Sequence, residues 1–457
     1  MSVQLVLLWS DVLLWLLCTA ALIFGWRSMR LLHLARGWAK LGKNPIATGT
    51  ATLLVAFLLV GLADSIHYRE ALPPLPDAAP DAEIRYGVEV FSALDYLLNP
   101  LRTQNEKTYS APFATRLYAM ESMETAAGIS RLYPRLTYGG AHLNDEIDRT
   151  ADIVKRLMTG VLLAFFLLAG LYVFSRRVLR KKYPGFAWQG ALAALCAIVL
   201  VFLPLFFLTE GYHVLGTDKV GQDVLYQALK SIRTALIIGL VTTLVMLPIA
   251  ILLGIAAGYF RGWMDDLIQY LYTVLNSIPG VLLIAAAVLM MQVILDTHPE
   301  WFATAAERAD LRLLALCMIL GVTSWTSLAR LLRGETMKLR ELEYIEAARA
   351  FGVPSGRIVI RHILPNLMHI VIIALVMDFS ALVLAEAVLS YIGIGVDPST
   401  TSFGTMINNA RMELSREPAV WWSLAAAFSF MFVLVLSANL FADAVRDAFD
   451  PRYEKRA

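Results

Sequence analysis

The chain has 457 residues, of which 58% are hydrophobic and 17% are charged. Soluble domains average about 25% charged residues. The mean hydropathy of +0.62 comes from long apolar runs, so the composition excludes a soluble globular protein and predicts a polytopic membrane protein. The net charge of +2 is too small to indicate a nucleic-acid partner. Cys18, Cys196 and Cys317 all lie inside apolar runs, so a disulfide framework is not indicated.

Nine apolar runs are long enough to cross a bilayer as helices, which takes about 20 residues each. The first run has no basic residues before it and carries Asp11, which favours a retained anchor over a cleaved signal peptide. The expected fold class is therefore an all-α polytopic membrane protein. The predicted spans are residues 5–26, 45–63, 153–175, 188–208, 230–258, 266–295, 311–333, 366–392 and 421–443.

The basic loops predict the orientation of the chain. Residues 27–43 and 176–182 each hold five Lys or Arg residues and no acid. Because such loops stay in the cytoplasm, we expect the N-terminus and residues 64–152 outside, and the C-terminus inside. The same count of spans puts Glu341 to Pro365 in the cytoplasm. The basic residues Arg446, Arg452, Lys455 and Arg456 near the C-terminus agree with this orientation.

The outer segment at 64–152 opens with a Pro-rich linker at 71–80. Apolar residues are spaced as in helices over Val88–Leu98 and Phe113–Ala127. We therefore expect a small, mostly helical insertion outside the membrane.

Turn and cap residues mark the stretch from Glu210 to Leu229. Gly216 and Gly221 permit turns, and Asp218 and Asp223 are candidate helix N-caps. We expect a capped helix at the outer rim, with a structural role.

Small and helix-breaking residues mark the fifth and sixth spans. Gly254 and Gly258 have the spacing that lets two helices pack closely in lipid. Asn276, Ser277 and Pro279 interrupt the next span, and a proline there removes a backbone hydrogen bond and kinks the helix. These three residues are candidates either for a translocation path or for a packing kink.

Two acids, Asp378 and Glu386, lie inside the eighth span. Ionisable groups inside a membrane rarely face lipid. Eight positions separate the two, which places them about 80° apart around a helix, on one side of it. Either acid could contact a substrate amine, pair with a partner subunit or anchor a local hydrogen bond, and the local role is favoured for Glu386.

The longest charged run of the second half is Glu341 to Pro365, between two apolar spans. Glu343 to Phe351 contains no helix breaker and three alanines that favour a helix. Gly352 stands where a helix C-terminus takes a left-handed residue, and Pro354 prevents simple continuation. The run therefore predicts a helix–turn–helix lying against the membrane.

This run resembles the "EAA loop" of permease subunits of bacterial ABC importers, the coupling helix that docks on the ATPase. In that family E-A-A is followed by three residues, Gly, nine residues and I-x-L-P. The matching residues here are Glu346, Ala347, Ala348, Gly352, Leu364 and Pro365. His362 departs from the pattern at the Ile position, but R-H-I-L-P-N at Arg361–Asn366 resembles the dipeptide/oligopeptide subgroup, as do the runs at 216–225 and 385–395. The resemblance implies that the six matching residues and His362 couple the chain to an ATPase.

The resemblance covers about residues 188–453 and implies a six-helix permease core with a coupling loop at 336–365. Residues 1–187 form an N-terminal extension of three further spans that it does not explain. It also implies a multi-pass protein of the bacterial inner membrane that works with a second homologous permease subunit, two ATPase subunits and an extracytoplasmic substrate-binding protein. No cofactor and no enzymatic activity are expected in this chain, because ATP and Mg would be bound by the ATPase subunits. Its partners would further include membrane lipid but no nucleic acid.

Several alternatives stay open at this point. The cargo could be a peptide, nickel, an opine, a glycan fragment or an antimicrobial peptide. An ion-coupled secondary transporter would use Asp378 and Glu386 to carry protons, but would leave the E-A-A spacing unexplained. An intramembrane enzyme would need a catalytic constellation that the sequence does not offer.

Two stretches imitate functional motifs. Gly37 to Asn44 has the Gly-x4-Gly-Lys spacing of a phosphate loop, but Asn44 replaces the Ser or Thr and no strand precedes it, so a basic cytosolic turn is favoured. His142 lies near Asp145 and Glu146, where a solvated turn is favoured over a metal site.

Overall fold

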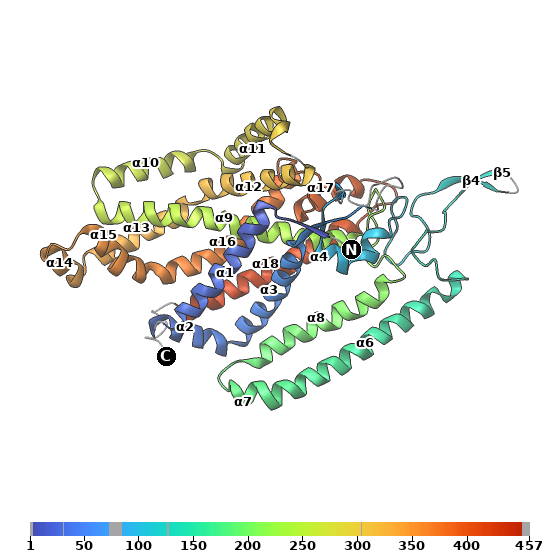
Figure 1. Ribbon diagram of the computed structural model, residues 1–457, viewed down its shortest axis with the longest axis horizontal. Coiled ribbons are helices and arrows are strands. Elements are labelled where there is room, and N and C mark those ends of the chain that lie inside the picture. The colour runs from blue at the N-terminus through green and yellow to red at the C-terminus, as the bar shows by residue number, and fades with distance from the viewer. Residues whose placement is uncertain (1–2, 31, 73–84, 126–127, 303, 450–457) are drawn as a thin grey trace. The chain divides into compact units, whose positions relative to one another are not determined.

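The computed structural model describes residues 3–30, 32–72, 85–125, 128–302 and 304–449 (Figure 1). Over these residues the chain is predominantly helical, and nine helical runs are long and apolar enough to cross a membrane. The all-α polytopic class and the number of predicted spans are therefore confirmed. The nine runs are Trp9–Ser28, Pro45–Asp64, Glu146–Lys182, Trp188–Thr209, Val224–Phe260, Gly280–Thr297, Ala305–Arg340, Ser355–Ile392 and Trp422–Phe449.

The sixth predicted span, 266–295, is two helices rather than one. Helix α10 (Trp263–Ser277) stops before Ile278, and α11 (Gly280–Thr297) starts after Pro279. Ile278 has an extended backbone, with φ −93° and ψ 131°, which is the conformation that a following proline favours. The proline was expected to kink this span, and it separates two helices.

The chain divides into two compact units, which we describe separately. Unit 1 takes residues 1–8, 39–235 and 398–437, and unit 2 takes 9–38, 236–397 and 438–457, in each case over their described parts. Helices α9 (Val224–Phe260) and α18 (Trp422–Phe449) each begin in unit 1 and end in unit 2.

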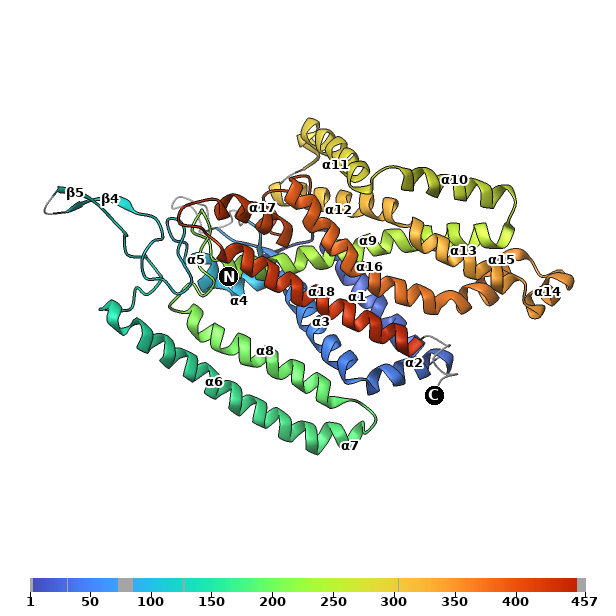
Figure 2. The same ribbon diagram turned by 180° about the vertical axis from the view of Figure 1, so that it is seen from behind.

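Unit 1 contains three of the apolar helices. Helix α8 (Trp188–Thr209) packs against α6 (Arg149–Phe174) and against α3 (Pro45–Asp64). Figures 1 and 2 both show α6 and α8 running side by side as a hairpin. The stretch from Gly37 to Asn44, which has the spacing of a phosphate loop, belongs mostly to helix α2 (Leu32–Lys43). The Asn44 side chain caps α3 by accepting a hydrogen bond from the Ile46 amide at 2.9 Å.

The outer segment of unit 1 is less helical than expected. Helix α4 (Ala93–Leu97) confirms the second half of the helix predicted at 88–98, whereas Phe91–Ser92 in its first half is a strand. A further short helix, α5 (Asn99–Thr103), begins after the predicted range. The helix predicted at 113–127 is wrong, because β4 (Glu121–Thr125) pairs there with β5 (Gly128–Leu132). Further strands, β1 (Val3–Val6), β2 (His67–Glu70) and β3 (Phe91–Ser92), form a small antiparallel sheet. The linker predicted at 71–80 lies mostly outside the described residues.

The helix predicted at 113–127 does not form because backbone amides within it bond to other segments. The Leu117 amide donates to the Pro134 carbonyl at 2.9 Å, and the Tyr118 amide donates to the Tyr109 carbonyl at 3.0 Å. Every buried backbone group needs a partner, and here the partners lie 9 and 17 residues away instead of the four residues of a helix. Apolar spacing alone does not reveal such pairing.

Unit 2 contains the helices that carry the predicted coupling loop. Helix α12 (Ala305–Ser324) continues almost directly into α13 (Thr326–Arg340) and packs against α1 (Trp9–Ser28) and α11. The predicted close packing at Gly254 and Gly258 is confirmed. A Cβ atom on Gly254 would lie 2.7 Å from the Ala329 carbonyl oxygen, and one on Gly258 would lie 2.7 Å from that of Arg333. Both glycines therefore allow α9 and α13 to approach backbone to backbone.

Candidate functional site

The run from Glu341 to Pro365 folds as the predicted helix–turn–helix. Helix α14 (Glu343–Ala350) is followed by α15 (Ser355–Ile358), the π-helical turn η4 (Val359–Ile363) and the long helix α16 (Leu364–Ile392). Gly352 has φ +73°, so the left-handed turn expected at this glycine is confirmed.

Hydrogen bonds at the end of α14 explain why the turn forms. The Val353 amide donates to the Ala348 carbonyl at 3.1 Å, and the Gly352 amide donates to the Arg349 carbonyl at 3.0 Å. This pair of bonds is the Schellman motif, which satisfies carbonyls at a helix C-terminus and requires a left-handed residue. Ala348 and Val353 both contact the apolar core of unit 2, so the turn is held by packing as well.

The loop has an inner and an outer face. Ile345, Ile358 and Ile363 are fully buried in a cluster built mainly from α9, α13 and α16. Leu364 also packs on this cluster. On the other side, Glu346, Ala347 and Pro365 are exposed, as is Phe351, whose side chain is 87% exposed. The loop therefore presents a fixed outward surface, which we call the coupling face: Tyr344, Glu346, Ala347, Phe351 and Ile360.

Two residues of the predicted coupling loop, Ala348 and His362, do not lie fully on the exposed surface. Ala348 is half-buried against the core, whereas Ala347 is exposed. His362 is half-buried, and its ring lies 6.2 Å from that of Tyr344, centroid to centroid. The Asn366 amide donates to the Tyr344 hydroxyl at 3.1 Å, so Tyr344 links α14 to the start of α16.

Ion pairs connect the elements around this loop. The guanidinium of Arg333 on α13 makes a two-pronged contact with Asp265 on α10, at 2.6 and 2.8 Å. Asp265 is buried, so this charge-assisted contact is largely shielded from water. Arg261, after α9, contacts Glu341 at 2.6 Å. The first pair joins α10 to α13, and the second joins the end of α9 to the residue that follows α13.

The candidate path residues Asn276 and Ser277 line an open pocket of about 480 Å³ at the end of α10, together with Tyr272, Thr273 and Arg330. The Arg330 guanidinium lies over the Tyr272 ring, 5.1 Å from its centroid. Pro279 is not part of this lining and instead precedes α11. Arg330 was not among the predicted site residues, although a cation within the predicted span at 311–333 is a recognised functional signal.

Asp378 and Glu386 both lie on α16, but in different surroundings. Glu386 is only 2% exposed and accepts a hydrogen bond from Ser390 Oγ at 2.6 Å. Asp378 is half-buried. The Glu386 contact agrees with the local hydrogen-bonding role favoured for it.

Comparison with known proteins places this arrangement in a family. Residues 250–455 match the family described as "Binding-protein-dependent transport system inner membrane component". The oligopeptide transport system permease protein OppC of Mycobacterium tuberculosis is 31% identical over 295 residues, which cover 60% of this chain and 92% of OppC. The chain belongs to this family of inner membrane transport components. It is thus a multi-pass inner membrane protein, and its family works with a substrate-binding protein and ATPase partners.

Two further relatives carry related names. The glutathione transport system permease protein GsiD of Pectobacterium atrosepticum is 34% identical over 242 residues, covering 52% of this chain and 73% of GsiD. The dipeptide transport system permease protein DppC of Bacillus subtilis is 27% identical over 243 residues, covering 53% of this chain and 70% of DppC. All three relatives leave a large part of this inner membrane component unmatched.

A buried charge network joins the outer segment, residues 64–152, to the turn before α9. The three side chains are Glu106, His213 and Asp223, and we call them the outer triad. His213 Nδ1 lies 2.8 Å from Asp223 Oδ2, and its Nε2 lies 3.6 Å from Glu106 Oε1. Burial alone would lower the pKa of His213, but the bond to Asp223 and the nearby Glu106 carboxylate outweigh it and raise the pKa to about 9. The imidazolium is therefore the stable form at neutral pH.

Backbone amides complete the outer triad. Glu106 accepts from the amides of Thr137, Tyr138 and Gly139 at 2.8 to 3.0 Å. Burial would raise the pKa of Glu106, but the nearby His213 imidazolium and the bonds from these amides hold the pKa at about 2. The cap predicted at Asp223 is confirmed, since its Oδ1 accepts from the Leu225 amide at 2.8 Å. Asp218 instead closes the preceding turn by accepting from Val220 and Gln222.

The outer triad predicts a pH window for stability. Because the pKa of His213 is raised, its contribution is complete below about 6.5 and is lost as pH rises through about 9. Because the pKa of Glu106 is lowered, its contribution is lost only as pH falls from about 4.5 toward 2. We expect the melting temperature of the detergent-purified protein to fall between pH 6.5 and 9, and this fall to shrink in His213→Gln. An unchanged fall in that variant would contradict the assignment.

Proposed function

We propose that this protein is the membrane permease subunit of an ATP-driven importer of peptide-type cargo. The names of its relatives, which transport oligopeptides, dipeptides or glutathione, support the cargo class. The observation that carries the proposal is the coupling face, an exposed surface with an aromatic tip on a loop whose inner face is locked into the core. Such a surface suits docking to a partner protein, because it is pre-formed and partly apolar.

In this proposal the coupling loop transmits movement from an ATPase. Glu346 and Ala347 contact the ATPase, and Gly352 sets the direction of α14. Ala348 and Leu364 anchor the loop, while His362 and Pro365 hold the junction with α16. The ion pairs Asp265–Arg333 and Arg261–Glu341 pass the movement to the membrane helices.

The same proposal assigns a path for the cargo. Asn276, Ser277 and Arg330 supply polar surface at the end of α10, where the break at Pro279 interrupts the membrane helix. Asp378 is a further candidate for this path, whereas Glu386 stabilises α16 through Ser390. Polar groups inside a membrane typically face a bundle interior or a water-filled path, which supports this assignment for Arg330.

We further propose that residues 188–453 form the permease core and that 1–187 are an extension that takes no part in ATP coupling. The functional complex would contain a second homologous permease subunit, two ATPase subunits that bind ATP and Mg, and an extracytoplasmic substrate-binding protein. ATP hydrolysis would then occur in the partners and not in this chain.

Transport in vesicles tests this function. The complex should be purified from native membranes through a tag on this chain and reconstituted with ATP inside. We expect an ATPase to co-purify and peptide uptake to need ATP and a binding protein. Uptake that follows an imposed proton gradient, with no ATPase in the purified material, would instead establish the secondary-transporter alternative.

Orientation is a separate prediction. Basic loops predict residues 64–152 outside and 336–365 inside, with the N-terminus outside and the C-terminus inside. In a cysteine-free background, Glu89→Cys should react with an impermeant thiol reagent in intact cells, because it is exposed and outside. The exposed Ser355→Cys should react only after the cells are permeabilised. The reverse pattern would overturn this topology.

A further inference from the structure

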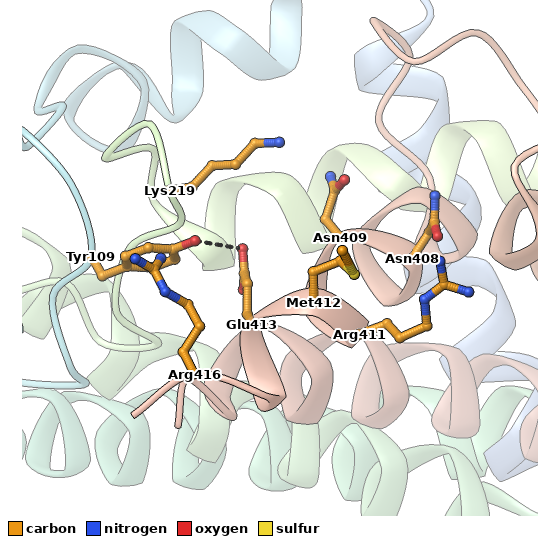
Figure 3. Close-up of a pocket in the computed structure, with 8 residues that line it drawn as sticks. All are labelled: Tyr109, Lys219, Asn408, Asn409, Arg411, Met412, Glu413 and Arg416. Carbon is orange, nitrogen blue, oxygen red and sulfur yellow. Dashed lines mark hydrogen bonds between the residues drawn. The ribbon is translucent and has the colours of Figure 1, made fainter. Parts of the chain in front are cut away.

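Unit 1 contains a small pocket that the proposed function does not use. Its volume is about 320 Å³, at the lower end of the range for small-molecule sites. Helix α17 (Phe403–Leu414) forms one wall, and the outer segment and the turn before α9 form the others (Figure 3). The lining residues are Tyr109, Lys219, Asn408, Asn409, Arg411, Met412, Glu413 and Arg416.

The pocket is built around a buried carboxylate. Glu413 is only 4% exposed, and Figure 3 shows its side chain pointing from α17 toward Tyr109 and Lys219. Its Oε1 accepts from the Tyr109 hydroxyl at 3.2 Å. Within the part of the chain that the structure describes, Oε2 has no hydrogen-bond partner. A buried carboxylate oxygen left without a donor is costly, so the site favours a ligand that brings one.

Arg416 does not supply a hydrogen bond to Glu413 Oε2. The Arg416 guanidinium lies over the Tyr109 ring, 4.8 Å from its centroid. Burial raises the pKa of Glu413, with Asp218 adding to the effect, while the Tyr109 bond, Lys219 and Arg416 oppose it. A second positive group with N–H donors beside Oε2 would therefore stabilise the carboxylate.

Apart from the Glu413 carboxylate, the polar residues that line the pocket are positively charged or neutral. Lys219, Arg411 and Arg416 carry positive charge, and Asn408 and Asn409 add neutral donors and acceptors. One small pocket thus offers an acceptor for an ammonium group and several donors for a carboxylate. The ligand chemistry that meets both requirements is a short zwitterion with a free amino group and a free carboxylate.

We propose that this pocket binds a short peptide through both of its charged ends, with the ammonium group at Glu413 and the carboxylate at Lys219. The inference rests on the proposed function, because it specifies how the chain meets peptide cargo. It assigns a role to the extension as well, since Tyr109 belongs to the outer segment and orients Glu413. The volume suits a dipeptide and excludes a folded partner domain.

Calorimetric titration of the complex in nanodiscs tests the proposal, with alanyl-alanine as the probe. We expect saturable binding that weakens by about ten- to a hundredfold in Glu413→Gln, the range for a lost charge-assisted hydrogen bond. N-acetyl-alanyl-alanine should lose a similar factor, and Lys219→Met should weaken alanyl-alanine but not its C-terminal amide. Glu417→Gln is the matched control, because Glu417 is exposed and does not line the pocket.

The outcomes separate the pocket from the wider function. Equal binding by wild type and Glu413→Gln, or by the free and acetylated dipeptides, would overturn the pocket assignment. So would absence of dipeptide binding combined with weaker capture of the binding protein by Glu413→Gln, which would make the occupant a basic side chain of that protein. Each of these results leaves the proposed function intact if the ATPase co-purifies with the complex, whereas absence of the ATPase contradicts the proposed function itself.

Discussion

Gly352→Val is expected to abolish the coupling between transport and ATP hydrolysis while the chain still inserts in the membrane. Gly352 has φ +73°, and a β-branched residue is strongly disfavoured there. Space is not the obstacle, because a Cβ atom at Gly352 would meet nothing within 4 Å. The substitution should therefore act by breaking the Schellman turn and redirecting α14. ATP hydrolysis stimulated by the loaded binding protein should fall to the basal level.

Gly356→Val is the matched control for this experiment. Gly356 lies in α15 without a positive φ, and a Cβ atom there would also meet nothing within 4 Å. Gly356→Val adds the same valine side chain four residues away from Gly352, but at a position where the backbone is not left-handed. Normal stimulation in Gly352→Val, or equal loss in both variants, would show that the left-handed turn does not aim the coupling loop.

Glu346→Lys tests the coupling face directly. The residue is exposed, so reversing its charge should leave folding intact. At a docked and partly desolvated contact, loss of one member of a charge pair costs about 2–5 kcal/mol. We expect weaker ATPase co-purification at normal membrane levels. Glu300→Lys, an equal charge change at another exposed site, should co-purify normally.

Among the substitutions proposed for this protein, Glu106→Ala is expected to lower the free energy of unfolding most. It would leave the His213 imidazolium with one fewer partner and three backbone amides without their acceptor, all in a buried site. Removing one partner of a buried pair typically costs about 3–5 kcal/mol. The outer segment should loosen from the turn before α9. A lower melting temperature and faster cleavage within residues 85–152 under limited proteolysis would report this.

The control for Glu106→Ala is Glu121→Ala. Glu121 pairs with Lys107 at 2.7 Å near the surface, where an ion pair contributes only about 0–1 kcal/mol. Similar melting temperatures for the two variants would show that burial of the outer triad does not stabilise the protein.

Most local features were predictable from the sequence, whereas long-range ones were not. The nine apolar helical runs follow from composition, and the turn at Gly352 follows from residue types within one helical turn. The outer triad joins Glu106 to a turn more than a hundred residues later, and no periodicity announces that contact. The pairing of β4 with β5 is local, and it was missed because the apolar spacing of this stretch also suits a helix. The roles of the coupling and path residues remain predictions, because they depend on partners outside this chain.

The exposed coupling face has a consequence for the life of the subunit in the cell. Phe351, Ile360 and Tyr344 are 87%, 67% and 45% exposed. A copy made without its partners would keep these apolar side chains in water, where such patches promote aggregation. Surplus copies are then expected to be recognised by chaperones and proteases. Degradation of orphan subunits would keep the number of chains in step with the supply of ATPase.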